Sequence, residues 1–441
     1  MGWVGMQCKV INALTSSTCH NTHTHTHKQT NKHKLFFNNT MTQLALECQR
    51  HMFDLDDSDT PVAYLNACSC SPIPTQVHEA ASQALAAKRK PWTMDTSTSS
   101  ETHVKRIYAK LLSNSSAVSE QDIALCPSTS YAMTLAANSV NWAIHANPTV
   151  VVLDQQFASN TMPWQHHAKL RIVQRRHGRN WTDGVLEELA NDDVACVAIP
   201  HAHWTDGSTV DVRAVAEACK AKSIPLALDL TQTLGAAPIA IGPDSVDATF
   251  VACSVHKHLY APYGASLLYV ARRHQAHMRR LEFHERQVRD WPDFDAKGAS
   301  LFDASTGGYP TESWTDMRKA DAGGRPNPTL MPALHASLEL VVGWDPRRIS
   351  EYVAPLSQLV EDAAIDVGLS VARPRVAHIV GIHTPSGSHL PSALELGAEL
   401  KKRGVLVSVR CGVLRVSFGV FNTVEEARMC ASVLREVCVA S

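Results

Sequence analysis

The chain has 441 residues, 44% of them hydrophobic and 19% charged, which is ordinary for a globular protein with one large domain and a smaller one. Its formal net charge is −1, so no overall field would draw nucleic acid or an anionic membrane to it. No apolar run reaches the roughly 18 residues of a membrane span. We therefore expect neither nucleic acid nor a membrane as a partner.

The twelve cysteines include no C-x-x-C pair, and the spacing of Cys68 and Cys70 is poor for metal ligands. We therefore predict no bound metal. Dispersed thiols in a chain of this length favour a reducing compartment, and the expected location is the cytoplasm.

Residues 1–40 differ in composition from the rest and are predicted to be disordered. They alternate Thr and His over Thr22–His27, and no acidic residue precedes Glu47. Two interpretations are open. A basic, acid-poor segment can be a mitochondrial transit peptide, although arginine is absent before Arg50. A Thr-His alternation is also what a CA dinucleotide repeat encodes, so the segment can be untranslated sequence with Met41 as the start, and we favour this interpretation.

Short apolar runs alternate with amphipathic stretches across residues 120–271. Nearly continuous runs such as Val150–Leu153 are typical of strands covered on both faces, and strands alternating with helices predict parallel β-α-β units. The predicted strands are 122–126, 149–154, 169–174, 194–199, 225–230, 247–253 and 265–271. The predicted helices between them are 131–146, 182–191 and 211–223. A short loop with Pro and Gly joins the last two strands, so one of them can run antiparallel.

Together with an N-terminal arm and helices at 60–112, this α/β core forms a predicted cofactor-binding domain over 60–330. Residues 331–441 are predicted to form a smaller α/β domain. A long helical region, 330–343 and 347–368, leads into it. Its predicted elements are strand 376–384, helix 391–403, strands 405–411 and 413–419, and helix 424–438. Thr423 and Glu426 form a capping box at the start of the last helix.

Three segments at the ends of predicted strands carry the side chains suited to a single cofactor. The nucleotide-binding motifs G-x-G-x-x-G and G-x-x-x-x-G-K-[ST] are absent from the sequence. The first segment, Pro127–Ala132, places hydroxyl groups and backbone N–H groups at a helix N-terminus, where a phosphate can bind. The second, Ala227–Gln232, ends a strand with Asp229. A carboxylate there can hold a pyridine nitrogen protonated, and Gln232 would reach the ring hydroxyl.

The third segment, Ser254–Gly264, places Lys257 at the end of an apolar strand, on the ligand-binding edge of the sheet. Desolvation and neighbouring positive charge would lower the pKa of this amine, so that it can attack an aldehyde. The three segments together predict pyridoxal 5′-phosphate (PLP), held by Lys257 as a Schiff base.

With these motifs the chain resembles the class V aminotransferase family of fold-type I PLP enzymes. That family includes cysteine desulfurases, kynureninase and isopenicillin N epimerase-like proteins. The resemblance extends from Tyr64–Ala67 to Phe421–Thr423. It implies an α/β fold, with a mostly parallel seven-stranded sheet in the large domain and a smaller α/β C-terminal domain. It also implies a homodimer, because fold-type I sites usually lie at a dimer interface.

The resemblance also implies roles for individual residues. Lys257 is the catalytic lysine, and Phe157 would stack on the cofactor ring where desulfurases carry a histidine. Arg325 lies where family members reach across a dimer toward the neighbour's phosphate. The implied cofactor-binding residues are Thr129, Ser130, Phe157, Asp229, Gln232, Ser254, His256, Lys257 and Arg325.

Substrate-binding residues follow from the same resemblance. Arg415 matches the arginine that clamps the substrate α-carboxylate, for which a bidentate guanidinium is well suited. Trp204 would line the substrate entrance, and Asn66 belongs to the motif at which the resemblance begins. The nearby His201 and His203 are candidate bases, but structural roles are expected for them.

One feature departs from the desulfurase pattern. In desulfurases a loop bearing the persulfide cysteine separates the last two strands before the arginine, whereas here Cys411 joins two strands almost directly within Val409–Arg415. This argues against a desulfurase that needs such a loop. The predicted function is aminotransferase chemistry on the α-amino group of an amino acid, with Lys257 moving the α-proton. A PLP-dependent lyase or epimerase and a non-catalytic PLP-binding protein are the alternatives.

Overall fold

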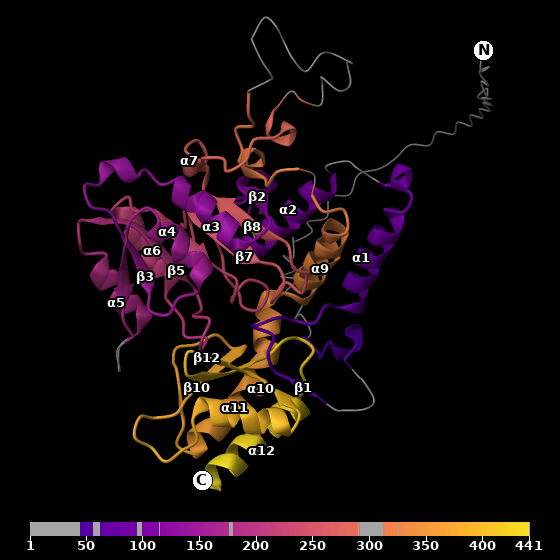
Figure 1. Cartoon of the computed structure of the whole chain (residues 1–441), viewed down its shortest axis with the longest axis vertical. Coiled ribbons are helices and arrows are strands. Elements are labelled where there is room, and N and C mark those ends of the chain that lie inside the picture. The colour runs from indigo at the N-terminus through magenta and orange to yellow at the C-terminus, as the bar shows by residue number, and fades with distance from the viewer. Residues whose placement is uncertain are drawn as a thin grey trace, which may run out of the picture. The chain divides into compact units, whose positions relative to one another are not determined.

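The computed structural model describes residues 45–55, 62–94, 99–113, 115–175, 180–289, 291, 312–324 and 326–440. Residues 45–441 cluster into one compact unit, and Figure 1 labels most of its helices and strands. The N-terminal segment 1–40 and Arg325 lie outside the described residues.

A seven-stranded sheet forms the centre of the large domain, with the strand order β2-β8-β7-β6-β5-β3-β4. Its strands are β2 (Ile123–Cys126), β3 (Thr149–Leu153), β4 (Lys169–Val173), β5 (Val194–Pro200), β6 (Leu226–Asp229), β7 (Phe250–Ser254) and β8 (Ser266–Val270). Strand β8 is antiparallel to both of its neighbours, β7 and β2, and the other pairings are parallel. The seven predicted strands are confirmed, and the antiparallel one is the last of them.

Helices cover both faces of this sheet, because alternate residues of a strand point to opposite sides. They are α2 (Ser99–Leu112), α5 (Trp181–Glu188), α6 (Val212–Ala221) and α9 (Leu330–Trp344) on one face, and α3 (Thr129–Asn138) and α4 (Met162–Gln165) on the other. Val151 and Val197 pack in the core with the first group, whereas Val152 and Ala198 pack with the second. Burial on both faces explains the continuous apolar sequences of these strands.

The direction of the strands brings several loops to one edge of the sheet. Strands β2, β3, β5, β6 and β7 all run the same way, so their carboxyl ends lie along a common edge. The residues at or just after these ends include Thr129, Phe157, Trp204, Asp229 and Lys257. This is the edge at which open α/β sheets bind their ligands.

A second hydrophobic core belongs to the C-terminal part of the chain. It lies between a four-stranded sheet, in the order β12-β13-β10-β9, and three helices. The elements are α10 (Pro346–Asp366), β9 (Ser370–Val371), β10 (Ile379–His383), α11 (Ala393–Lys402), β12 (Ser408–Arg410), β13 (Val413–Ser417) and α12 (Val424–Val439). A parallel pair of β1 (Ala63–Tyr64) with β11 (Val405–Leu406) joins the N-terminal arm to this core.

The remaining described elements are short or lie at the periphery. They are α1 (Thr75–Ala87), α7 (Arg272–Gln275) and 3-10 helices at Arg50–Met52, Pro91–Thr93, Glu120–Asp122, Trp142–Ile144, Ala158–Asn160, Glu285–Gln287 and Met317–Ala320. Helix α1 packs on α9 through Val77, Ala333 and Ala336. No helix within the described ranges is both long and apolar enough to cross a membrane.

One predicted helix, 131–146, has different bounds in the structure. It begins at Thr129, because the side chain of Ser128 caps it by accepting a hydrogen bond from the Tyr131 N–H. It ends at Asn138, and Trp142–Ile144 form a separate turn. Beyond the end of the helix, the Ser139 hydroxyl donates to the carbonyl of Leu135 over 2.7 Å. Side chains thus satisfy carbonyls at which the helix stops.

Two predicted strands of the small domain are also corrected. The strand predicted at 376–384 begins only at Ile379, because the preceding residues pair instead with the loop around Gly207, where Val376 N–H donates to the Gly207 carbonyl over 3.0 Å. The strand predicted at 405–411 divides at Val407 into β11 and β12, which belong to different sheets. Both changes depend on pairing partners far away in the sequence.

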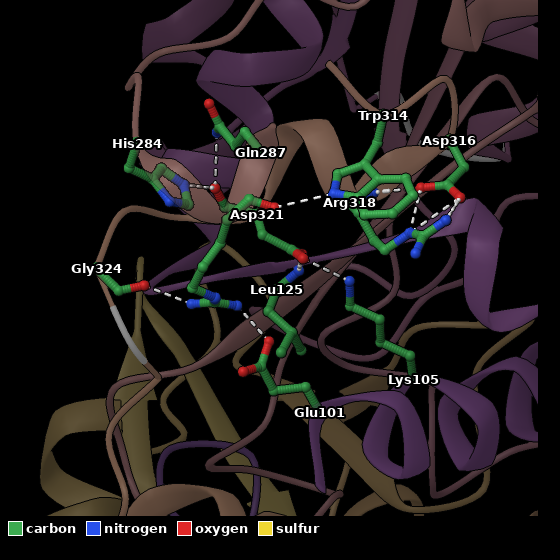
Figure 2. Close-up of polar contacts among 11 residues, drawn as sticks. Glu101, Lys105, Leu125, His284, Gln287, Trp314, Asp316, Arg318, Asp321 and Gly324 are labelled. Carbon is green, nitrogen blue, oxygen red and sulfur yellow. Dashed lines mark hydrogen bonds and ion pairs between the residues drawn. The ribbon is translucent and has the colours of Figure 1, made fainter. Parts of the chain in front are cut away.

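A polar network holds residues 312–324 against α2 and β2 (Figure 2). Lys105 forms a buried ion pair of 2.7 Å with Asp321, whose other carboxylate oxygen accepts the Leu125 N–H over 2.7 Å. Arg286 bridges Glu101 and the carbonyl of Gly324. The network therefore anchors the chain immediately before Arg325.

Candidate active site

The amine of Lys257 lies in the loop that follows β7, where its side chain is half-buried. Burial lowers the pKa of this amine below its ordinary value, while the nearby carboxylate of Asp229 opposes the shift and the guanidinium of Arg415 adds to it. The Nζ atom lies 5.5 Å from the centre of the Phe157 ring. The structure thus brings the predicted lysine, carboxylate, guanidinium and stacking aromatic into one site.

Asp229 is the last residue of β6 and its side chain is buried. One carboxylate oxygen accepts the backbone N–H of Thr231 over 2.9 Å, which orients the group. Burial raises the pKa of this carboxyl above its ordinary value, and the positive charge of Lys257 only partly compensates. A further N–H donor with positive charge would stabilise the ionised form, and a protonated pyridine nitrogen has both properties.

Hydroxyl groups gather where α3 begins. Thr129 Oγ1 lies 2.6 Å from Ser254 Oγ and 3.4 Å from Ser266 Oγ. Ser254 is held in turn by its own N–H, which donates to Thr231 Oγ1 over 3.1 Å. Ser130, on the first turn of α3, is exposed. The partial positive charge of a helix N-terminus together with clustered hydroxyl donors suits a phosphate group.

The two other predicted cofactor residues have partners within the protein. Gln232 is buried, donates to the Cys68 carbonyl over 3.2 Å and has its Oε1 3.2 Å from His258 Nε2. The ring of His256 stacks on Tyr263 with 3.9 Å between centroids. Burial, and then the charge of Lys257, lowers the pKa of His256 to about 4, so this imidazole is neutral at pH 7.

Arg415 is a buried cation held by neutral groups. Its side chain is only 1% exposed, and it donates to Ser408 Oγ over 3.2 Å, to Ser69 Oγ over 2.7 Å and to the Trp204 carbonyl. Within the described ranges no carboxylate lies within ion-pair distance of it. Burying a cation without an anion is costly, so this position favours a ligand that carries a carboxylate.

Aromatic side chains lie beside the lysine and the arginine. Phe157 and Trp204 make an edge-to-face contact with 5.3 Å between ring centroids. Trp204 is fixed by its indole N–H, which donates to the Gln155 carbonyl over 2.7 Å. Phe157 is 44% exposed, so one side of this pair faces open space. A planar aromatic ligand could stack there.

Asn66 bridges to Ser417 of β13 through the backbone, and its side-chain oxygen accepts the Ser69 hydroxyl over 2.8 Å. Since Ser69 also contacts Arg415, Asn66 lies one contact away from the guanidinium. Ser69 and Ser408, both absent from the sequence prediction, orient Arg415. The position of Ser69 three residues after Asn66 was a signal that could have identified it.

His201 and His203 have structural partners. His201 Nδ1 lies 3.0 Å from Thr233 Oγ1, and His203 lies between Thr205 Oγ1 at 2.7 Å and the Asp154 carbonyl at 3.0 Å. Burial lowers the pKa of each imidazole to about 4. Both neutral side chains therefore have fixed hydrogen-bond partners.

The residues present fit PLP. They combine a half-buried amine, a buried carboxylate with no cationic hydrogen-bond partner among the described residues, and a hydroxyl cluster at a helix N-terminus. Lys257 would hold the cofactor covalently, Asp229 would face its ring nitrogen, and Thr129 with Ser254 would hold the phosphate.

Comparisons with known proteins agree with this chemistry. The family model described as Aminotransferase class-V matches residues 63–304, more than half of the chain. The uncharacterized aminotransferase YcbU of Bacillus subtilis is 24% identical over 312 residues, covering 70% of this chain and 76% of that protein. Cysteine desulfurase IscS of Pasteurella multocida is 36% identical over 116 residues, covering 24% of this chain and 28% of that protein.

Solved structures share the fold. Cysteine desulfurase CsdA of Escherichia coli has a TM-score of 0.71 at 19% identity, covering 89% of this chain and 98% of that one. A C-DES variant with glycine covalently linked to its PLP cofactor has a TM-score of 0.70 at 14% identity, covering 88% of this chain and 99% of that one. The chain belongs to the class V aminotransferase family of PLP-dependent enzymes, and it has the fold-type I architecture.

Proposed function

We propose that this enzyme transfers the α-amino group of an amino acid to a 2-oxo acid. The observation that carries the proposal is that the amine of Lys257 and the buried guanidinium of Arg415 belong to the same site. Among the described residues this guanidinium has no carboxylate partner. A substrate that satisfies both groups carries an amine and a carboxylate on neighbouring atoms, which describes an α-amino acid.

The residues divide the work between binding and proton transfer. Arg415 binds the α-carboxylate and thereby turns the Cα–H bond toward Lys257. Burial lowers the pKa of Lys257 and so favours its neutral form, in which Nζ can accept the α-proton. PLP, when bound, supplies an electron sink for the electron pair that this proton leaves behind. Asp229 would hold a proton on the ring nitrogen of this cofactor, and Phe157 would stack on its ring.

The second candidate is a lyase, favoured by the 36% local identity to a cysteine desulfurase. The hairpin of β12 and β13 weakens the desulfurase version of this candidate. Cys411 occupies a two-residue turn between these strands, with φ of 48°, next to Gly412 with φ of 79°. Such a turn leaves no loop on which the thiol could travel to Lys257.

The test is to incubate PLP-loaded enzyme with a panel of amino acids in D2O and to follow the Cα–H signal by NMR. Loss of that signal reports removal of the α-proton, and the products then separate the reactions. A 2-oxo acid formed without ammonia supports transamination. Ammonia or sulfide release identifies a lyase, and a racemised amino acid identifies an epimerase.

Two variants make the test specific. Lys257→Arg keeps the charge but removes the nucleophilic amine, and it should abolish Cα–H exchange, while the surface variant Lys110→Arg should exchange at the wild-type rate. Arg415→Lys should raise KM for amino acids by about 100-fold, because a bidentate contact with a carboxylate is lost. Absence of exchange with every amino acid in the wild type would leave a non-catalytic PLP-binding protein as the answer.

We further propose that the enzyme is a homodimer of the cytoplasm, in which Arg325 approaches the partner's phosphate site. The proposal is supported by family resemblance. Light scattering of the purified protein tests whether it is a dimer. Arg325→Ala should weaken PLP binding and leave the dimer intact. Location is tested by fractionation of the source cells, where recovery in mitochondria would instead favour a transit peptide at residues 1–40.

A further inference from the structure

Three buried side chains from distant parts of the chain meet beside the lysine loop. Cys68 follows β1, His258 is the residue after Lys257, and His378 immediately precedes β10; their exposed fractions are 0%, 1% and 0%. One potential ligand atom from each of them lies within 4.8 Å of the other two. We propose that Cys68, His258 and His378 form a binding site for Zn²⁺ or another ion that prefers sulfur and imidazole ligands.

The hydrogen bonds of His378 leave one ring nitrogen ready to bind an ion. Its Nε2 lies 2.8 Å from the backbone carbonyl of Gln232, and because a carbonyl can only accept, Nε2 carries the hydrogen. The neutral ring then has a lone pair on Nδ1. This atom is buried and has no hydrogen-bond partner among the described residues. Metal-bound histidines commonly donate their other ring N–H to a carbonyl in the same way.

His258 reaches the same state through the side chain of Gln232. The Gln232 amide nitrogen donates to the Cys68 carbonyl over 3.2 Å, which fixes the orientation of the amide and turns Oε1 toward His258. His258 Nε2, 3.2 Å from that oxygen, is therefore the donor. Its Nδ1 is again a buried lone pair with no partner in the part of the chain that the structure describes.

Two neighbouring buried nitrogen lone pairs without a partner among the described residues are unusual, because buried polar atoms are nearly always paired. The rings of His258 and His378 make an edge-to-face contact, with centroids 4.6 Å apart and an interplanar angle of 71°. No charged donor of the described chain satisfies either Nδ1. A cation between the two rings would stabilise both lone pairs.

Cys68 supplies the third ligand. Cys68 forms no disulfide, and its Sγ lies 3.6 Å from His258 Nε2, the nitrogen that carries the hydrogen, so the thiol would turn toward the two Nδ1 atoms to bind the ion. One sulfur and two imidazole nitrogens are a ligand set that Zn²⁺ accepts, with distances of about 2.3 Å to sulfur and about 2.0 Å to nitrogen. On binding, the thiol bond to hydrogen breaks, the proton passes to solvent, and the sulfur electron pair forms the bond to the ion.

The position of the site indicates a structural effect. An ion held by these three residues would join the N-terminal arm, the Lys257 loop and the small domain. It would also stabilise Gln232, which contacts all three residues through its side chain or backbone. The expected consequence is a higher thermal stability of the ion-bound protein, by mass action on the folded state.

The test uses the full-length protein, first treated with a chelator and then dialysed against Zn²⁺. Because the N-terminal histidines can also bind Zn²⁺, the total metal content alone is not informative, and Zn X-ray absorption is used to detect a sulfur ligand. We expect a sulfur atom at about 2.3 Å from the ion. Cys68→Ser should remove this signal, and the matched variant of another buried thiol, Cys430→Ser, should keep it.

The wild-type measurement decides the question even if a variant folds poorly. A wild-type protein with no sulfur-bound Zn²⁺ would overturn the proposal and leave a buried water as the partner of the two nitrogens. A sulfur signal that persists in Cys68→Ser would overturn it as well, because the thiol would then belong to another cysteine. His378→Gln should lower the affinity for Zn²⁺ by at least about 10-fold. Circular dichroism of the same sample shows whether the variant is folded, so that a lost ligand is distinguished from misfolding.

Discussion

Ser69 Oγ accepts a 2.7 Å hydrogen bond from Nη2 of Arg415, so a residue of the N-terminal arm orients a guanidinium on β13, 346 positions later in the chain. The same hydroxyl donates to Asn66 Oδ1 over 2.8 Å and accepts a 3.3 Å hydrogen bond from Arg410 Nη2. These hydrogen bonds thus link the N-terminal arm to the proposed carboxylate site and orient its guanidinium.

Ser69→Ala should therefore weaken amino-acid binding more than it slows the reaction. Loss of one hydrogen bond to a charged group costs about 1.5 kcal/mol, which corresponds to a rise in KM of roughly tenfold with kcat little changed. Steady-state kinetics with a responsive amino acid measures both constants. Ser71→Ala, two residues on, serves as the control and should leave KM unchanged. A fall in kcat at constant KM would contradict the orienting role.

Thr129→Val should weaken cofactor binding while preserving the fold. The substitution removes the hydroxyl that lies 2.6 Å from Ser254 Oγ at the proposed phosphate site, and it keeps the branched shape of the side chain. We expect the Kd of PLP to rise by about 10-fold, measured by titrating the apoenzyme and following its visible absorption.

Thr134→Val is the matched control for this variant. Thr134 lies one turn later on α3 and its hydroxyl donates to the Ser130 carbonyl over 2.7 Å, away from the hydroxyl cluster. Its PLP affinity should match that of the wild type. Equal affinities for all three proteins would exclude Thr129 from the phosphate site.

Acid should destabilise the protein partly through Asp206. Burial alone would raise the pKa of this carboxyl, but the His383 imidazole, the Arg175 guanidinium and Ser208 together hold it well below its ordinary value. A depressed pKa in the folded state contributes stability above the unfolded pKa of about 3.9, and this contribution is lost as the pH falls toward the folded pKa.

The prediction is a Tm that falls below about pH 4, with a smaller fall in Asp206→Asn than in the wild type. Calorimetry at a series of pH values measures it. Glu217→Gln, which alters an exposed carboxylate paired with Arg213, should leave the acid limb unchanged. If Asp206→Asn and the wild type lose stability in parallel, the acid sensitivity has another source.

Lys105→Met should destabilise the protein by about 3–5 kcal/mol, because it leaves the buried charge of Asp321 without its partner. Both side chains are nearly inaccessible, and Asp321 also accepts the Leu125 N–H, so the carboxylate cannot move into solvent (Figure 2). Urea unfolding monitored by circular dichroism gives the free energy. Lys402→Met breaks the exposed pair with Glu399 and should cost less than about 1 kcal/mol. Similar losses in the free energy of unfolding for the two variants would contradict the stabilising role of the buried Lys105–Asp321 pair.

The large sheet was the part of the fold most accessible from sequence. Its strands are buried on both faces, so each one is a local run of apolar residues that needs no knowledge of its neighbours. Asp229 and Lys257 could be located for the same reason, since Asp229 ends such a run and Lys257 follows one by three residues. The small domain was harder, because β1, β9 and β11 have two residues each and exist only through their pairing partners.

The sequence by itself determined the class of chemistry, through the lysine, the aspartate and the hydroxyl segment that close three apolar strands. Only the tertiary structure decided which groups surround them: Ser69 on Arg415, Ser266 near Thr129, and the meeting of Cys68 with His258 and His378. The physical reason is range. Strand ends follow from local hydrophobicity, whereas these contacts join residues more than a hundred positions apart, and nothing in their immediate sequence records the partner. The prediction of no metal rested on the spacing of Cys68 and Cys70, which carries no information about His258 and His378.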